Sequence, residues 1–148
     1  MKATLSPRAT LTLEEANAMA RGAIAEARRL ELAPICVALL DAAGTTKAMM
    51  TEDRVALMRP QIATAKAWGC LGLGFSTQTF TAMAEGMGPL FQTFRGLADD
   101  RLVPSPGGVL ISRDGDLIGA IGVSGDTGPN DQLCAVAGVE ASGLIAQL

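Results

Sequence analysis

Two pairs of short apolar segments, each pair joined by a tight turn, are the feature that most limits what this chain can fold into. Residues 35–40 and 45–50 flank an Asp-Ala-Ala-Gly turn, and residues 108–112 and 117–124 flank an Arg-Asp-Gly-Asp turn. Strands joined by tight turns pair antiparallel, whereas neighbouring parallel strands need a long crossover between them. The hairpins therefore predict an antiparallel sheet and argue against a Rossmann-like sheet of alternating strands and helices.

Helical patterns fill most of the remaining chain. Thr12 and Glu15 form a capping box, and Pro60 suits the first turn of a helix because its missing N–H is not needed there. The order helix, hairpin, helices, hairpin, helix predicts an α/β protein of the α+β type, with residues 1–148 forming a single domain. The expected helices span about 12–30, 60–68, 76–86 and 127–144, whereas 89–106 has no clear pattern.

The absence of histidine excludes most familiar catalytic and metal sites. Without it there is no Ser-His-Asp or Cys-His nucleophile, no His-ligated zinc and no proximal histidine for haem. The three cysteines, Cys36, Cys70 and Cys134, lie far apart and form no Cys-x-x-Cys motif. We expect them to be small buried apolar side chains, with neither a disulfide framework nor a metal site.

The charge and the hydropathy of the chain limit the kinds of partner that it can bind. The formal net charge of −3 lacks the basic character of a nucleic-acid-binding surface. No segment approaches the ~20 apolar residues that cross a bilayer. The first ten residues, MKATLSPRAT, lack the apolar stretch of a secretory signal. The expected protein is cytoplasmic and binds neither nucleic acid nor membrane.

A glycine stands at every third position of the segment GAIGVSGDTG, residues 119–128. The spacing matches neither the dinucleotide fingerprint nor the P-loop, and Asp126 adds negative charge where a phosphate would lie. Gly119 and Gly122 are interpreted as places of close packing or a bulge, and Gly125 and Gly128 as the turn into a helix. A ligand carbonyl or carboxylate at that helix N-terminus remains an alternative.

The same segment resembles the GlcG/HbpS family. GAIGVSG follows an upstream Pro106-Gly-Gly-Val and an Asp-Gly turn, as it does in that family. The N-terminal LTLEEA helix, the VALLDAAG hairpin, the helix around Lys66 and the Phe75-Ser-Thr segment fit the same order. The resemblance covers nearly the entire chain.

The resemblance implies a profilin-like, three-layer α/β/α fold with a five-stranded antiparallel sheet. It also implies a homo-oligomer, from dimer to octamer, with a small-molecule ligand. Some family members bind, sense or degrade haem, and related domains are attached to PduO-type corrinoid adenosyltransferases. Here haem is disfavoured, because histidine and tyrosine are absent and the family's Arg-x-Asp is replaced at Thr51, Glu52 and Asp53. We therefore expect no cofactor.

Lys66 is the leading catalytic candidate. A lysine in a helix rich in Ala, Ile and Trp either has a lowered pKa or requires a partner. Asp53 is expected as its counter-ion, and Asp53 or Glu52 would move a proton. The alternatives are a structural Lys66–Asp53 pair and a lysine that extends to solvent.

The expected ligand-binding residues surround Lys66. Arg59 shares its helix face, Arg54 lies close by, and the backbone N–H groups of Gly107 and Gly108 could stabilise an oxyanion. A simple strand-entry turn would have the same Pro-Gly-Gly sequence. An adaptable pocket or ordinary core is expected from the remaining apolar side chains: Met49, Met50, Met58, Met83, Met87, Trp68, Phe75 and Phe80.

Three classes of function agree with these residues. The first is a cofactor-independent catabolic enzyme, a lyase or isomerase that acts on a small oxygenated acid, aromatic acids included. The second is a haem- or tetrapyrrole-binding or sensing protein without its own catalysis. The third is a non-catalytic sensor or assembly scaffold. The missing histidine and the cationic face around Lys66 place the first class ahead.

Overall fold

The fold is α+β, with five helices and one five-stranded antiparallel sheet among the described residues, as expected. The computed structural model describes residues 10–148, so most of the N-terminal stretch examined for a secretory signal lies outside the described residues. The elements are α1 (Leu13–Arg29), β1 (Cys36–Asp41), β2 (Thr46–Thr51), α2 (Arg59–Leu73), α3 (Thr77–Gly86), α4 (Gly88–Leu97), β3 (Gly108–Arg113), β4 (Asp116–Ser124), α5 (Gly128–Ala141) and β5 (Ile145–Gln147).

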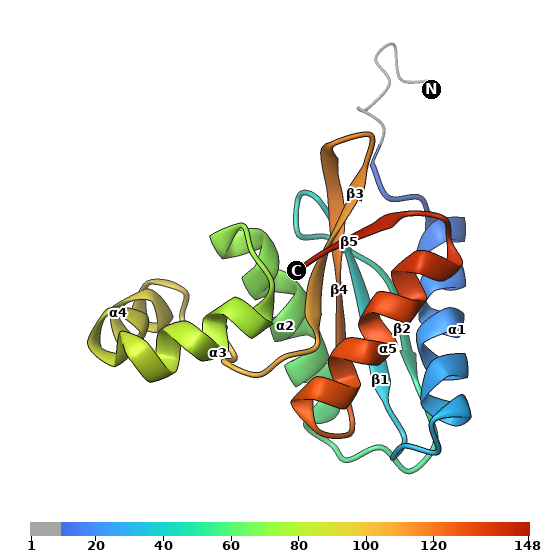
Figure 1. Ribbon diagram of the computed structural model, residues 1–148, viewed down its shortest axis with the longest axis horizontal. Coiled ribbons are helices and arrows are strands. Elements are labelled where there is room, and N and C mark those ends of the chain that lie inside the picture. The colour runs from blue at the N-terminus through green and yellow to red at the C-terminus, as the bar shows by residue number, and fades with distance from the viewer. Residues whose placement is uncertain (1–9) are drawn as a thin grey trace, which may run out of the picture.

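The sheet has the strand order β2-β1-β4-β3-β5, with every neighbouring pair antiparallel. Helices α1 and α5 lie side by side on one face, and α2 lies on the other (Figure 1). The two expected hairpins are β1–β2 and β3–β4, and they meet in the middle of the sheet because β1 pairs with β4. This arrangement confirms the three layers that the resemblance implied.

Side chains alternate between the two faces of the sheet and create two cores. Val37 and Leu39 of β1 pack against α1 and α5, whereas Ala38 and Leu40 pack against α2. Small residues on α2, such as Ala63 and Ala67, bring that helix close to the strands. Its position on the sheet is therefore fixed by backbone contacts as well as by side chains.

Helices α3 and α4 form an arm that projects away from the layered body (Figure 1). The arm has a core cluster of its own, centred on Phe80 and Phe91, with Ala98 and Leu102 at its base. The 89–106 segment had given no clear pattern, and its first half is α4. Six of the ten residues of that helix are Gly, Pro, Thr or Phe, which are weak or modest helix formers, so tertiary packing holds it.

Two element boundaries differ from the sequence expectation. Helix α5 ends at Ala141 instead of about 144, because Gly143 adopts a left-handed conformation with φ of 70° and redirects the chain into β5. Helix α2 continues past Trp68 to Leu73 and ends at Gly74, which is also left-handed. The glycines at 69 and 72 therefore lie inside the helix, where they make room for neighbouring rings.

The glycines of β4 serve close packing, as the sequence predicted. A β-carbon at Gly122 would overlap the carbonyl oxygen of Ala63 on α2, and it would lie 2.8 Å from the backbone nitrogen of Ala67. A β-carbon at Gly119 would overlap the carbonyl oxygen of Leu40 on β1. These glycines let α2 and the strands approach more closely than any side chain would permit.

Within residues 10–148, no helix is both long and apolar enough to span a bilayer.

Candidate functional site

Lys66 is among the largest fully buried side chains of the described residues, with 1% of its surface exposed. Its Nζ donates hydrogen bonds to Asp131 Oδ2, at 2.8 Å, and to the carbonyl oxygen of Val123, at 3.0 Å. Lys66 lies on α2, Val123 on β4 and Asp131 in the first turn of α5. The lysine thus connects helices from opposite faces of the sheet.

Asp131 is as deeply buried as its partner. Its second oxygen, Oδ1, accepts a hydrogen bond from the backbone N–H of Asp126 at 3.0 Å, so the carboxylate also holds the turn before α5. Burial lowers the pKa of Lys66 and raises the pKa of Asp131, while the attraction between the two charges opposes both shifts. Sequence reasoning, which expected Asp53 as the counter-ion of Lys66, missed this pairing.

The Pro-Gly-Gly segment packs around this ion pair. A β-carbon at Gly107 would lie 2.9 Å from Lys66 Nζ and 2.8 Å from the β-carbon of Asp131. Gly108 donates its N–H to Thr77 Oγ1 at 2.8 Å, so this group is already bonded and does not point to a ligand. The Gly108 N–H is therefore occupied in this conformation, both glycines provide space around Lys66, and the expected oxyanion role stays a prediction.

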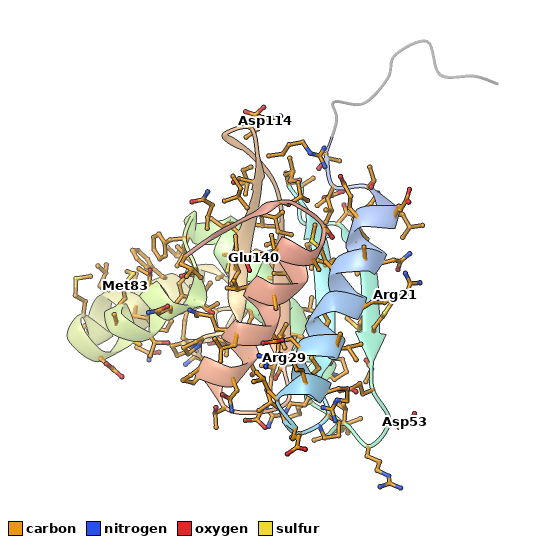
Figure 2. All side chains as sticks on the ribbon, turned by 45° about the vertical axis from the view of Figure 1, so that its right-hand side comes forward. Arg21, Arg29, Asp53, Met83, Asp114 and Glu140 are labelled. Carbon is orange, nitrogen blue, oxygen red and sulfur yellow. The ribbon has the colours of Figure 1, made fainter. Side chains whose placement is uncertain are left out.

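Asp53 does not meet Lys66. It lies exposed in the loop between β2 and α2, at the lower edge of Figure 2, whereas Lys66 is buried inside the fold. The expected Lys66–Asp53 pair is wrong, because Asp131 occupies the position next to the ammonium group. No local pattern could have revealed a partner 65 residues away.

Glu52 and Arg54, from the same loop, also lie apart from Lys66. Glu52 accepts the backbone N–H of Ile35 at 2.8 Å and pairs with Arg28 of α1 at 3.1 Å, so it fastens the ends of β1 and α1. Arg54 is exposed and has a left-handed backbone with φ of 68°. These contacts give Glu52 a structural role.

Of the two arginines expected to bind a ligand, Arg59 is the one that joins the Lys66 neighbourhood. It is half-buried, and its Nη1 lies 3.3 Å from Ser124 Oγ, at the end of β4 next to Val123. Its charge lowers the pKa of both Lys66 and Asp131, in each case as a minor contribution. Met58, immediately before Arg59, is 67% exposed. One surface groove lies beside Trp68 and another along α5, and Met58 lines neither of them.

Trp68 forms the wall of an open groove on the outer side of α2. The guanidinium carbon of Arg101 lies 3.7 Å from the centre of a Trp68 ring, which is a cation–π contact. Met49, on β2, projects to the same face of the sheet as its cross-strand partner Ala38 and lies 42% exposed. The groove has a volume of about 470 Å³ and is lined by Met49, Pro60, Gln61, Thr64, Ala65, Trp68 and Arg101; we call it the Trp68 groove.

The expected methionine-rich pocket is only partly assembled. Met49 and Trp68 share the groove, but Met50 packs against the opposite face of the sheet. Met83 and Phe75 belong to the arm, where Figure 2 shows Met83 far from the sheet. Sequence reasoning missed Arg101 because it lies in the unassigned 89–106 stretch, 33 residues beyond Trp68.

A second groove runs along α5 and has a volume of about 610 Å³. Its floor is apolar, with Leu133, Val136 and Ala137 of α5. Its charged lining residues are Glu26 and Glu140, both acidic, and Figure 2 shows Glu140 on α5. This groove is larger than the Trp68 groove but has the opposite charge character.

The described residues contain no cluster of Cys, Asp or Glu that could hold a metal ion. All three cysteines are free and buried. Burial raises the pKa of the Cys36 thiol, that of Cys70 to about 12 and that of Cys134 to about 11, so these side chains stay protonated thiols at neutral pH.

The architecture and the two open grooves define a compact α+β domain with space for a small ligand outside its core. Residues 11–140 match the family described as "Haem degrading protein HbpS-like", and the chain belongs to this HbpS-like family. This finding confirms the resemblance seen in the sequence.

Individual relatives agree with this family assignment. The corrinoid adenosyltransferase PduO of Citrobacter freundii is 25% identical over 139 residues, which are 94% of this chain and 41% of PduO. This chain therefore spans about two fifths of that enzyme. An uncharacterized 15.0 kDa protein from the dhaT–dhaS intergenic region of the same organism is 32% identical, over 86% of this chain and 88% of its own length.

A solved structure supports the fold. The crystal structure of the PduOC:haem complex matches with a TM-score of 0.85 and 24% identity, covering 95% of this chain and all of that one. At this identity the match establishes the shared fold.

Proposed function

We propose that this protein binds haem, or a closely related planar tetrapyrrole, in the Trp68 groove. The observation that carries the proposal is the stacked pair of Trp68 and Arg101 at the side of this largely apolar groove. An aromatic wall offers a flat apolar surface to a macrocycle, and an arginine offers paired donors to a carboxylate such as a haem propionate. The volume of about 470 Å³ lies within the range of about 300–1,000 Å³ of small-molecule sites.

The relatives support this choice of ligand. The family description refers to haem degradation, and the PduOC relative was crystallised with haem. Of the two grooves, the Trp68 groove suits an anionic ligand, because none of its described lining residues is acidic and Arg101 supplies a positive charge. The α5 groove presents Glu26 and Glu140, which would repel propionates.

The side chains that line the groove suit the macrocycle better than they suit the iron. The groove contains one sulfur ligand, the Met49 thioether, and the chain has no histidine or tyrosine to replace it. Bound haem would supply a redox-active iron. Trp68 would stack on the ring, Arg101 would hold a propionate, and Ala65 with Pro60 would exclude water from one ring edge.

A pair of matched variants tests where haem binds. Ala65→Phe fills the Trp68 groove, and Ala137→Phe places the same side chain in the α5 groove; both alanines are half-buried on helices. We expect Ala65→Phe to weaken haem binding at least about tenfold, because the ring and the macrocycle cannot share the space, a loss of about 1.4 kcal/mol. Ala137→Phe should leave the affinity unchanged. Haem titration followed by Soret absorbance gives both values.

The reverse pattern, with Ala137→Phe as the damaging variant, would move the ligand to α5. Binding that neither variant affects, or no saturable binding by the wild-type chain, would contradict the proposal. Thermal melting of each variant without ligand separates loss of binding from loss of folding.

The lyase or isomerase hypothesis has less support. Its catalytic pair, Lys66 and Asp53, is not brought together, and Lys66 is sealed from solvent by Asp131 and Gly107. A general base must lie within hydrogen-bond reach of the proton that it removes. The hypothesis stays a prediction without an assembled site in the described residues.

The protein is also expected to form a homo-oligomer. Large apolar side chains remain exposed in the described chain, among them Leu57 at 88%, Leu97 at 80% and Leu133 at 54%. A symmetric neighbour is the simplest cover for such surfaces. Light scattering at micromolar concentration should give at least twice the chain mass of 15.2 kDa. A monomer under these conditions would contradict this prediction without affecting the haem proposal.

Two further expectations belong to the same proposal. Residues 1–148 are taken as one domain of the family, and the cytoplasm is taken as its compartment.

A further inference from the structure

Resting on the proposed function, we infer that the Trp68 groove recognises the ring and the carboxylates of a tetrapyrrole and not its metal. Metal-free protoporphyrin IX should therefore bind about as tightly as haem. The inference depends on which donor atoms the fold leaves accessible at this groove.

The side chains that bind haem iron most strongly are absent or buried. The sequence contains no histidine and no tyrosine. Cys36, Cys70 and Cys134 are 0% exposed, so none can reach a ligand at the surface. Lys66 is held between Asp131 and the Val123 carbonyl.

Among the described residues that line the Trp68 groove, Met49 is the remaining candidate for an iron ligand, and its position suits contact better than coordination. A thioether is a soft, neutral donor that usually assists a stronger ligand on the other side of the iron. Met49 lies on β2, an edge strand of the sheet, and 42% of its surface is exposed. Its flexible side chain can cover the macrocycle edge without fixing the iron at one place.

Arg101 is prepared for a carboxylate. Its Nε donates to the carbonyl oxygen of Ala98 at 3.0 Å, which orients the guanidinium across Trp68. Asp99, 3.8 Å from the Arg101 Nη2, is 88% exposed, and such surface pairs contribute little free energy. A ligand carboxylate can therefore replace Asp99 at small cost, and a charge-assisted pair with arginine favours it.

Trp68 is also the only tryptophan of the chain, so its fluorescence reports on this groove. The experiment titrates the full chain with haem and, separately, with metal-free protoporphyrin IX, and follows the quenching of Trp68. We expect dissociation constants within about threefold of each other. Arg101→Gln should weaken both ligands about tenfold, as expected for one charged hydrogen bond. Arg21→Gln, on the exposed face of α1, is the matched control and should change neither (Figure 2).

Each outcome decides between the two proposals. If neither compound binds, the proposed function fails and the inference fails with it. If haem binds at least about tenfold more tightly than protoporphyrin IX, the metal is recognised; the inference is then overturned while the proposed function stands. In that case Met49→Leu, which keeps the volume and removes the sulfur, shows whether the thioether is the ligand. Equal loss of both ligands in Arg101→Gln, with a ratio of haem affinity to protoporphyrin affinity that Met49→Leu does not change, supports the inference.

Discussion

Replacing Lys66 with methionine should lower the free energy of unfolding by about 3–5 kcal/mol, because it leaves the Asp131 carboxylate buried without its cation. A purely catalytic Lys66, as the sequence suggested, would instead give a folded variant that loses function. Chemical denaturation of the wild type and the variant measures the difference. Because the ion pair connects α2 to α5, the loss should also appear as a lower melting temperature.

Two further variants separate the charge from the position. Lys47→Met, the same substitution at a half-buried lysine of β2, should change stability by less than about 0.5 kcal/mol. Lys66→Met combined with Asp131→Leu removes both charges and should recover most of the loss, since apolar replacements of a buried pair are often neutral or stabilising. If Lys66→Met alone melts like the wild type, the ion pair does not hold the fold.

Gly122→Ala should destabilise the protein by at least about 3 kcal/mol, at the upper end of the usual cost of overpacking. The added β-carbon would overlap the Ala63 carbonyl oxygen, which belongs to the backbone and cannot rotate away. Helix α2 would have to move off the sheet, and its core contacts would weaken with it. Thermal unfolding followed by circular dichroism tests this.

Gly96→Ala is the matched control. Gly96 lies within α4, a β-carbon added there would meet no atom within 4 Å, and its φ is not positive. Alanine has a higher helix propensity than glycine, so this variant should be neutral or stabilised by up to about 1 kcal/mol. Similar losses in both variants would mean that the space around Gly122 is not the cause.

The hairpins and most helices could be predicted because each rests on a local pattern. The α1 capping box is present as expected, with the Thr12 side chain bonded to Glu15 N–H. Strand β5 has only three residues, and the sequence pattern continued the last helix almost to its start. The fifth strand was expected only from the family resemblance.

The candidate site was harder to predict because its contacts join distant segments. The helix around Lys66 correctly indicated a buried lysine that needs a partner, but the partner depends on how α5 returns to the sheet. The same holds for Arg101, which contacts Trp68 because the chain returns to α2 after the arm. The ligand groove was therefore indicated by Trp68 and Met49 alone.

Trp68 belongs to two packing clusters, since it contacts both the α2 core and the base of the arm. Trp68 therefore contributes both to the free energy of docking the arm and to the free energy of ligand binding. By thermodynamic reciprocity, any ligand that holds Trp68 in its packed position stabilises the docked arm by the same factor by which the docked arm tightens the ligand. The arm thus acts as an energetic partner of the groove even though α3 does not line it.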